Sequence, residues 1–142
     1  MRTRIKFCGL TRPGDVRLAV ELGVDALGFI FAKQSKRKLD DSQIEGLRQA
    51  CSPLVTVIAL FMDNTGVEVS SAIRQLSPNL LQFHGNENDT FCRSFGLPFI
   101  KSLPMGEGAL DPIQAIKRYP SAAAFLLDGH RPGETGGRGE KF

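Results

Sequence analysis

The chain has 142 residues, of which 42% are hydrophobic and 23% are charged, and its formal net charge is +3. These values are typical of one globular domain, and the basic residues are too evenly spread to indicate nucleic-acid binding. No apolar stretch is long enough for a signal peptide or a membrane-spanning helix, so we expect a cytoplasmic protein without membrane contact. The three cysteines lack the spacings of disulfide frameworks and zinc sites, so we expect reduced thiols and no metal.

Short apolar runs alternate with segments of helical spacing along the chain. The runs, which predict buried strands, cover residues 5–8, 26–31, 54–61, 80–83, 99–100 and 122–127. The segments between them predict helices over residues 13–22, 41–50, 67–76, 87–95 and 112–117. Because a parallel crossover needs about a dozen residues and is usually helical, this alternation predicts an α/β fold with a parallel sheet.

Polar residues at the ends of the predicted strands distinguish a closed barrel from an open doubly wound sheet. In a barrel such residues meet at one mouth, whereas in an open sheet only those near the switch point share a site. The residues in question are Cys8, Asp63 with Asn64, His84, Lys101 with Ser102, and Asp128. Their positions, each at the end of a different predicted strand, favour a TIM (β/α)8 barrel.

The length of the chain bears on how complete this barrel is. A (β/α)8 barrel needs roughly 200 residues or more, and about six strand–helix units are recognisable here. We therefore expect residues 1–142 to form a single barrel domain that is truncated at its C-terminus, or six units that close differently. An open parallel sheet would expose two edges and apolar surface, which favours self-association.

Residues 6–12, with the sequence Lys-Phe-Cys-Gly-Leu-Thr-Arg, form the most specific segment. The first predicted strand delivers Cys8 into a glycine turn just before a predicted helix. A helix N-terminus and basic neighbours, here Lys6 and Arg12, both stabilise the thiolate form of a cysteine, which is the reactive form. The alternative is that Cys8 is a small buried hydrophobic residue, as many unpaired cysteines are.

The apolar run over residues 122–127 ends in a carboxyl group, that of Asp128. A carboxyl at the rim of a dry core tends to stay protonated, which suits a general acid. The alternatives are a helix cap and a rim residue in a salt bridge. A loop with five glycines follows over residues 129–139. Backbone N–H groups in such a loop can surround an anion, although a flexible surface loop is an equal alternative.

Two further residues follow predicted strands. The guanidinium of Arg37 can bind a carboxylate through two parallel hydrogen bonds, unless the segment is simply a solvated loop. His84 can titrate near neutral pH, but a hydrogen-bonded structural histidine explains its position equally well. We therefore assign no catalytic role to His84.

Five segments, taken in order, resemble the phosphoribosylanthranilate isomerase family. They are residues 6–12, 23–31 with 35–37, 81–85, 126–128 and 136–139. The resemblance implies a (β/α)8 barrel that catalyses an Amadori rearrangement in tryptophan biosynthesis. The family converts N-(5-phosphoribosyl)anthranilate, a small phosphosugar, into 1-(o-carboxyphenylamino)-1-deoxyribulose 5-phosphate without a metal or an organic cofactor.

The same resemblance implies roles for individual residues. Asp128 would be the general acid that opens the furanose ring, and Cys8 the general base that removes the C2′ proton. Arg37 would bind the anthranilate carboxylate. The residues implied for phosphate binding are Gly136, Gly137 and Gly139. The family usually has Thr or Ser where this chain has Arg138, so the phosphate loop is expected to differ in charge.

Three hypotheses for the function follow from the sequence. The first is an isomerase, and the second is an inactive barrel fragment that self-associates or complements a missing C-terminal part. The third is a thiol redox protein built around Cys8, which is less favoured because no second cysteine lies close to it in sequence.

Overall fold

Six parallel strands form one sheet in residues 2–106 and 111–129, the residues that this computed structural model describes. The strands are β1 (Lys6–Cys8), β2 (Ala26–Ile30), β3 (Thr56–Phe61), β4 (Leu80–Phe83), β5 (Phe99–Pro104) and β6 (Ala124–Asp128). The helices between them are α1 (Pro13–Glu21), α2 (Asp41–Ala50), α3 (Gly66–Leu76), α4 (Asp89–Arg93) and α5 (Pro112–Lys117). The alternation predicted from the sequence is thus confirmed.

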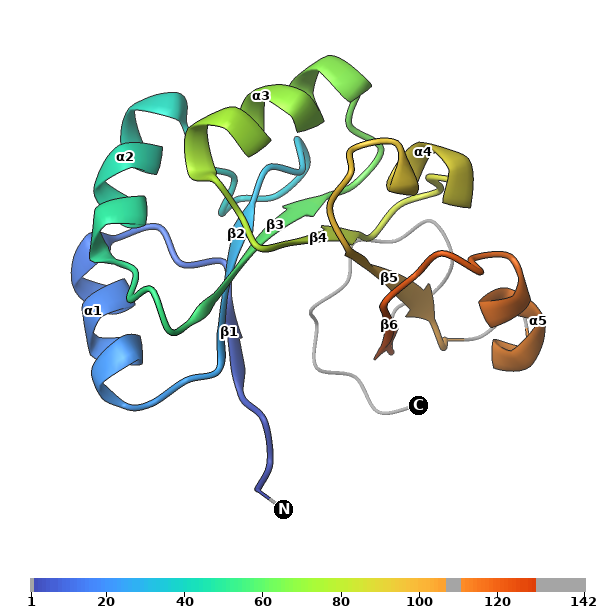
Figure 1. The fold of residues 1–142 in the computed structure, drawn as a ribbon, viewed down its shortest axis with the longest axis horizontal. Coiled ribbons are helices and arrows are strands. Elements are labelled where there is room, and N and C mark those ends of the chain that lie inside the picture. The colour runs from blue at the N-terminus through green and yellow to red at the C-terminus, as the bar shows by residue number, and fades with distance from the viewer. Residues whose placement is uncertain (1, 107–110, 130–142) are drawn as a thin grey trace.

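The order of the strands decides between the two candidate architectures. Neighbours in the sheet follow chain order from β1 to β6, and every neighbouring pair is parallel. A doubly wound sheet instead reverses its order at a switch point. The sheet is curled, and the helices follow one another around its outer side (Figure 1). The fold is therefore of the (β/α)-barrel type, as predicted.

The outer face of the sheet carries the main hydrophobic core. Successive strand residues point to opposite faces, and the outward ones pack against the helices. Phe83 of β4 is fully buried, and its ring centroid lies 5.8 to 6.1 Å from those of four other rings. Those rings belong to Phe61, Phe91, Phe95 and Phe99. This aromatic cluster joins β3, β4, β5 and α4.

The inner face carries a smaller apolar cluster. Ile30, Ala32 and Leu60 are buried there, and Cys8 and Met62 pack against them. The inner face also carries polar side chains that line a pocket, among them Lys6 of β1 and Gln82 of β4, so it forms a candidate site.

The fifth strand is longer than its apolar run predicts, and this corrects one expectation about the site. Lys101 and Ser102 lie inside β5 rather than after it. Lys101 points to the outer face, where its side chain is only 2% exposed and Nζ lies 3.2 Å from Oε2 of Glu87. Nζ also donates hydrogen bonds to the backbone carbonyls of Phe83 and Gly85. A charged residue continues this strand because its ammonium group is fully satisfied under the helices.

Candidate active site

A pocket of about 560 Å³ opens on the inner face at the carboxyl ends of the strands. In barrel enzymes this end of the sheet holds the active site. The polar residues that line the pocket include Lys6, Cys8, Arg37, Gln82, His84 and Asp128. They come from β1, β4, β6 and the loops after β2 and β4. The structure therefore brings together the three predicted site residues that it describes: Cys8, Arg37 and Asp128.

Cys8 ends β1 directly beside Gly28 of β2. A Cβ atom on Gly28 would lie 2.7 Å from the sulfur of Cys8, a distance that real Cβ contacts do not reach. The absence of a side chain at residue 28 is thus what leaves room for the thiol on the inner face. Cys8 is partly exposed and lines the pocket, although it also packs against the inner apolar cluster, as a small hydrophobic residue would.

Arg37 lies above the same turn. Its Nη1 donates a 2.8 Å hydrogen bond to the backbone carbonyl of Cys8, and its guanidinium passes over Gly9. Gly9 has φ +81°, which disfavours any residue with a side chain, and a Cβ there would collide with the guanidinium. The turn after β1 therefore holds the cation beside the backbone of Cys8 and leaves the rest of the guanidinium at the mouth of the pocket.

Asp128 ends β6 and faces His84, which follows β4. Oδ2 of Asp128 lies 3.5 Å from Nε2 of His84, and the two side chains are 17% and 9% exposed. The backbone N–H of His84 donates to the carbonyl of Phe61, which fixes its position at the end of the sheet. The sequence left His84 open between a group that titrates near neutral pH and a structural histidine, and the structure makes it the neighbour of the predicted acid.

The remaining strand-end residues do not enter the pocket. Asn64 donates to the carbonyl of Phe31 and accepts from the N–H of Met62, so it braces the loop after β3. Asp63 accepts from the N–H of Asn86, and Glu87 accepts from the N–H of Asp63. These groups, together with Lys101, fasten the loops after β3 and β4 to each other. They support the site without lining it.

The other two cysteines are poor candidates for chemistry. Burial raises the pKa of the Cys92 thiol to about 12, and burial also raises the pKa of the Cys51 thiol. Among the described residues, Cys8 is thus the cysteine that a substrate in the pocket can reach. The described residues contain no group of three or more His, Cys, Asp or Glu side chains that could hold a metal ion.

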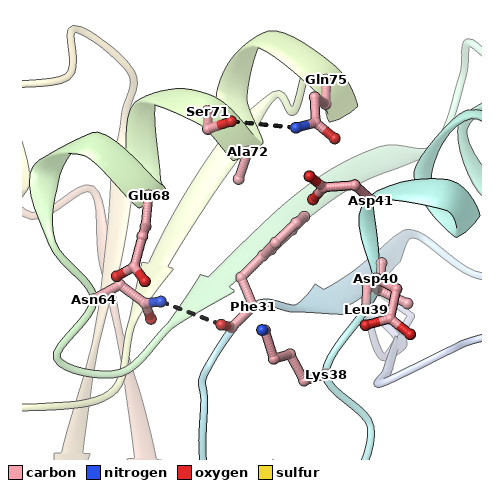
Figure 2. Close-up of a pocket in the computed structure, with 10 residues that line it drawn as sticks. All are labelled: Phe31, Lys38, Leu39, Asp40, Asp41, Asn64, Glu68, Ser71, Ala72 and Gln75. Carbon is pink, nitrogen blue, oxygen red and sulfur yellow. Dashed lines mark hydrogen bonds between the residues drawn. The ribbon is translucent and has the colours of Figure 1, made fainter.

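A second pocket, of about 470 Å³, lies on the opposite side of the sheet between α2 and α3. Figure 2 shows the side chain of Phe31 between the two helices, with Gln75 of α3 and Asp41 of α2 both near the outer end of its ring. Two hydrogen bonds join residues of its lining, one from Gln75 to Ser71 and one from Asn64 to the carbonyl of Phe31. None of the predicted site residues lines it.

The predicted phosphate-binding residues Gly136, Gly137 and Gly139 lie outside the described residues, so this prediction is not tested by the structure. None of the helices within residues 2–106 and 111–129 is long and apolar enough to cross a membrane.

The fold and the position of the pocket define a (β/α)-barrel protein with its site at the carboxyl ends of the strands. A family model described as N-(5'phosphoribosyl)anthranilate (PRA) isomerase matches residues 5–142. The chain belongs to this family, as its sequence motifs predicted.

Individual relatives agree with the family assignment. The N-(5'-phosphoribosyl)anthranilate isomerase of Xanthomonas campestris pv. campestris (strain 8004) is 53% identical over 146 residues, which cover 99% of this chain and 66% of the relative. The phosphoribosyl anthranilate isomerase of Thermus thermophilus has a TM-score of 0.80 at 36% identity, covering 93% of this chain and 65% of that one.

A third relative was solved with a ligand. It is a phosphoribosyl anthranilate isomerase in complex with reduced 1-(o-carboxyphenylamino)-1-deoxyribulose 5-phosphate, with a TM-score of 0.73 and 25% identity. The match covers 89% of this chain and 65% of that one. This chain thus spans about two thirds of the length of the relatives it matches.

Proposed function

We propose that this chain supplies the acid and the base of an N-(5-phosphoribosyl)anthranilate isomerase of tryptophan biosynthesis. The observation that carries the proposal is that Cys8 and Asp128, which end β1 and β6, line one pocket at the carboxyl ends of a (β/α)-barrel sheet. Membership of the isomerase family supports the same reaction.

The reaction needs one proton donor and one proton acceptor. Asp128 donates a proton to the ring oxygen, the bond between that oxygen and C1′ breaks, and the nitrogen lone pair forms an iminium double bond. The Cys8 thiolate then removes the C2′ proton, and the released electron pair forms the C1′–C2′ double bond while neutralising the nitrogen. The enol loses its hydroxyl proton and C1′ gains one, which gives the ketone. No electrons leave the substrate, so no redox cofactor is part of the proposal.

The surroundings of the two groups suit these opposite roles. Cys8 shares the pocket with the basic side chains of Lys6 and Arg37. Asp128 ends β6 in the same pocket, and Nε2 of His84 lies 3.5 Å from its carboxyl group. His84 is thus proposed as a positioning residue for the acid.

Substrate binding is assigned to cationic and backbone groups. Arg37 is proposed to bind the anthranilate carboxylate, because its guanidinium is held beside the base and faces the mouth of the pocket. The backbone N–H groups of Gly136, Gly137 and Gly139 are proposed to bind the phosphate. The bound phosphosugar analogue of the solved relative supports a phosphosugar as the substrate class.

The wider setting belongs to the same proposal. The single (β/α)-barrel domain expected over residues 1–142 is proposed to work in the cytoplasm, where this biosynthetic substrate would be met. Apolar side chains on the two outermost strands, namely Phe7, Leu126 and Leu127, are 37 to 48% exposed. These exposed side chains support association with a second copy or with a complementing chain. Sedimentation of the purified chain measures its mass and so detects association with a second copy.

The function is tested by following the loss of anthranilate-substrate fluorescence with a coupled downstream enzyme. Two samples are compared: the chain alone, and the chain co-expressed with the C-terminal third of the Xanthomonas campestris relative. We expect turnover in the co-expressed sample and little or none in the chain alone, since this chain spans 66% of that relative. Absence of turnover in the co-expressed sample would contradict the proposal.

The two roles are tested in the co-expressed sample. Cys8→Ala and Asp128→Asn should each lower kcat by about 10²- to 10⁴-fold, the usual contribution of a general acid or base. The matched controls are Cys51→Ala and Asp41→Asn, which lie outside the pocket and should leave kcat unchanged. Unchanged turnover in either active-site variant would show that its assigned role is wrong.

A further inference from the structure

Lys6 extends along the inner face toward Cys8. The two residues are separated by one position in β1, so their side chains share the inner face of the strand. A Cβ on Gly28 would lie 3.2 Å from Nζ of Lys6 and 2.7 Å from Sγ of Cys8. The ammonium and the thiol therefore flank the same gap and lie within roughly 6 Å of each other.

One side chain holds the ammonium in place. Nζ of Lys6 donates a 2.9 Å hydrogen bond to Oε1 of Gln82, a residue of β4 that is only 2% exposed. Because Gln82 is buried and fixed in the sheet, it restrains the lysine across the floor of the pocket. An amide oxygen accepts this hydrogen bond without neutralising the charge.

The positive charge of Lys6 is consequently not neutralised by the group that holds it. Within residues 2–106 and 111–129, Lys6 forms no ion pair with a carboxylate, unlike Lys101, which binds Glu87. A positive charge at about 4–6 Å favours the anionic form of a neighbouring acid. Among the described pocket residues, the thiol of Cys8 shares the Gly28 gap with this ammonium.

We propose that Lys6 is a positioning residue whose ammonium group, restrained by Gln82 and accommodated by Gly28, holds Cys8 as a thiolate. Its role in the isomerisation rests on the function proposed above. The thiolate itself is a property of this chain that can be measured without any substrate.

The test is the rate at which Cys8 of the whole chain is alkylated by iodoacetamide as a function of pH, measured by mass spectrometry of the modified peptides. Lys6→Met should lower the rate near neutral pH by about three- to tenfold and move the pH dependence to higher pH, because a partly exposed charge is screened. Lys6→Arg keeps the charge and should restore most of the rate. The matched control is Lys117→Met, an exposed lysine of α5, which should react like the unchanged chain.

Cys92 reports in the same samples whether the fold is intact. Its thiol is buried and its pKa is raised to about 12, so it stays unmodified unless the structure opens. If Lys6→Met exposes Cys92, then Lys6→Gln, which retains a hydrogen-bonding end for Gln82, provides the neutral variant. An unchanged pH dependence of Cys8 in a folded neutral variant would overturn the proposal.

This outcome is separable from failure of the proposed function. If Cys8→Ala leaves turnover intact, the assignment of the base is wrong, but the alkylation rates still report on Lys6 and Cys8. If Cys8 is essential for turnover but its alkylation rate is the same with and without Lys6, only the role of Lys6 is wrong. If both proposals hold, Lys6→Met lowers kcat near neutral pH, turnover recovers at higher pH, and KM changes little.

Discussion

The two faces of the sheet treat a lysine in opposite ways. On the outer face, Lys101 is 2% exposed and is satisfied by two backbone carbonyls and the carboxylate of Glu87. On the inner face, Lys6 has one neutral amide partner and borders a pocket. A charge enclosed by helices must be neutralised, whereas a charge beside a pocket remains available for chemistry. Lys101 is thus paired with a carboxylate, whereas Lys6, for which a functional role is proposed, has a neutral partner.

The largest effect on stability is expected for the outer lysine. Lys101→Met leaves the carboxylate of Glu87 buried without its cation, which should lower the free energy of unfolding by about 3–5 kcal/mol. Urea denaturation followed by circular dichroism measures the change. The double variant Lys101→Met/Glu87→Gln should lose less, and Lys6→Met about 1–2 kcal/mol, because it removes only the donor to the neutral amide of Gln82. Equal losses for Lys101→Met and Lys6→Met would remove the contrast between the two faces.

A smaller difference is expected between apolar residues of the two faces. Phe83→Ala removes the centre of the aromatic cluster and should cost about 3 kcal/mol, because its four ring neighbours cannot close the cavity. Leu60→Ala on the inner face should cost about 2 kcal/mol, since the space it vacates adjoins an open pocket. The same urea experiment measures both. A larger loss for Leu60→Ala would show that the inner face is the principal core.

The smallest effect is expected for an ion pair that lies on neither face. The side chain of Lys33 binds Glu68 at 2.8 Å, and this hydrogen bond, with that of the Thr65 backbone, lowers the pKa of Glu68 to about 2. Since the folded pKa is depressed, the contribution is present above the unfolded value of about 4.5 and disappears as the pH falls toward 2.

Thermal unfolding of the unchanged chain and of Lys33→Met checks this pH dependence. Both groups are more than a third exposed, so solvent screening should keep the difference below about 1 kcal/mol. The difference should be greatest above about pH 4.5 and vanish near pH 2. A difference that grows on acidification would contradict the sign.

The sequence was sufficient where local patterns determine the structure. The alternation of apolar runs and helical segments predicted the parallel sheet, and the strand-end positions of Cys8 and Asp128 predicted a shared pocket. It failed for Lys101, because a lysine after two apolar residues is typical of a strand end. The groups that let β5 continue, Glu87 and the carbonyl of Gly85, lie 14 and 16 residues away.

The place of His84 was also beyond sequence reasoning. Its partner Asp128 is 44 positions later in the chain and two strands away in the sheet. Because both residues follow predicted parallel strands, the sequence placed them at the same end of the sheet, but it gave no distance between them. Lys6 was recognised only as a basic neighbour, since its tie to Gln82 spans 76 positions.

The consecutive strand order makes the spacing of the proposed acid and the proposed base depend on the bend of the sheet. Cys8 and Asp128 end β1 and β6, with four strands between them in the described sheet. The helices pack against the outer side of that curled sheet (Figure 1), so a change in their packing would change the distance between the carboxyl ends of β1 and β6. A substitution in the outer core that changes the bend would therefore change the distance between Cys8 and Asp128, although it lies several strands from either residue.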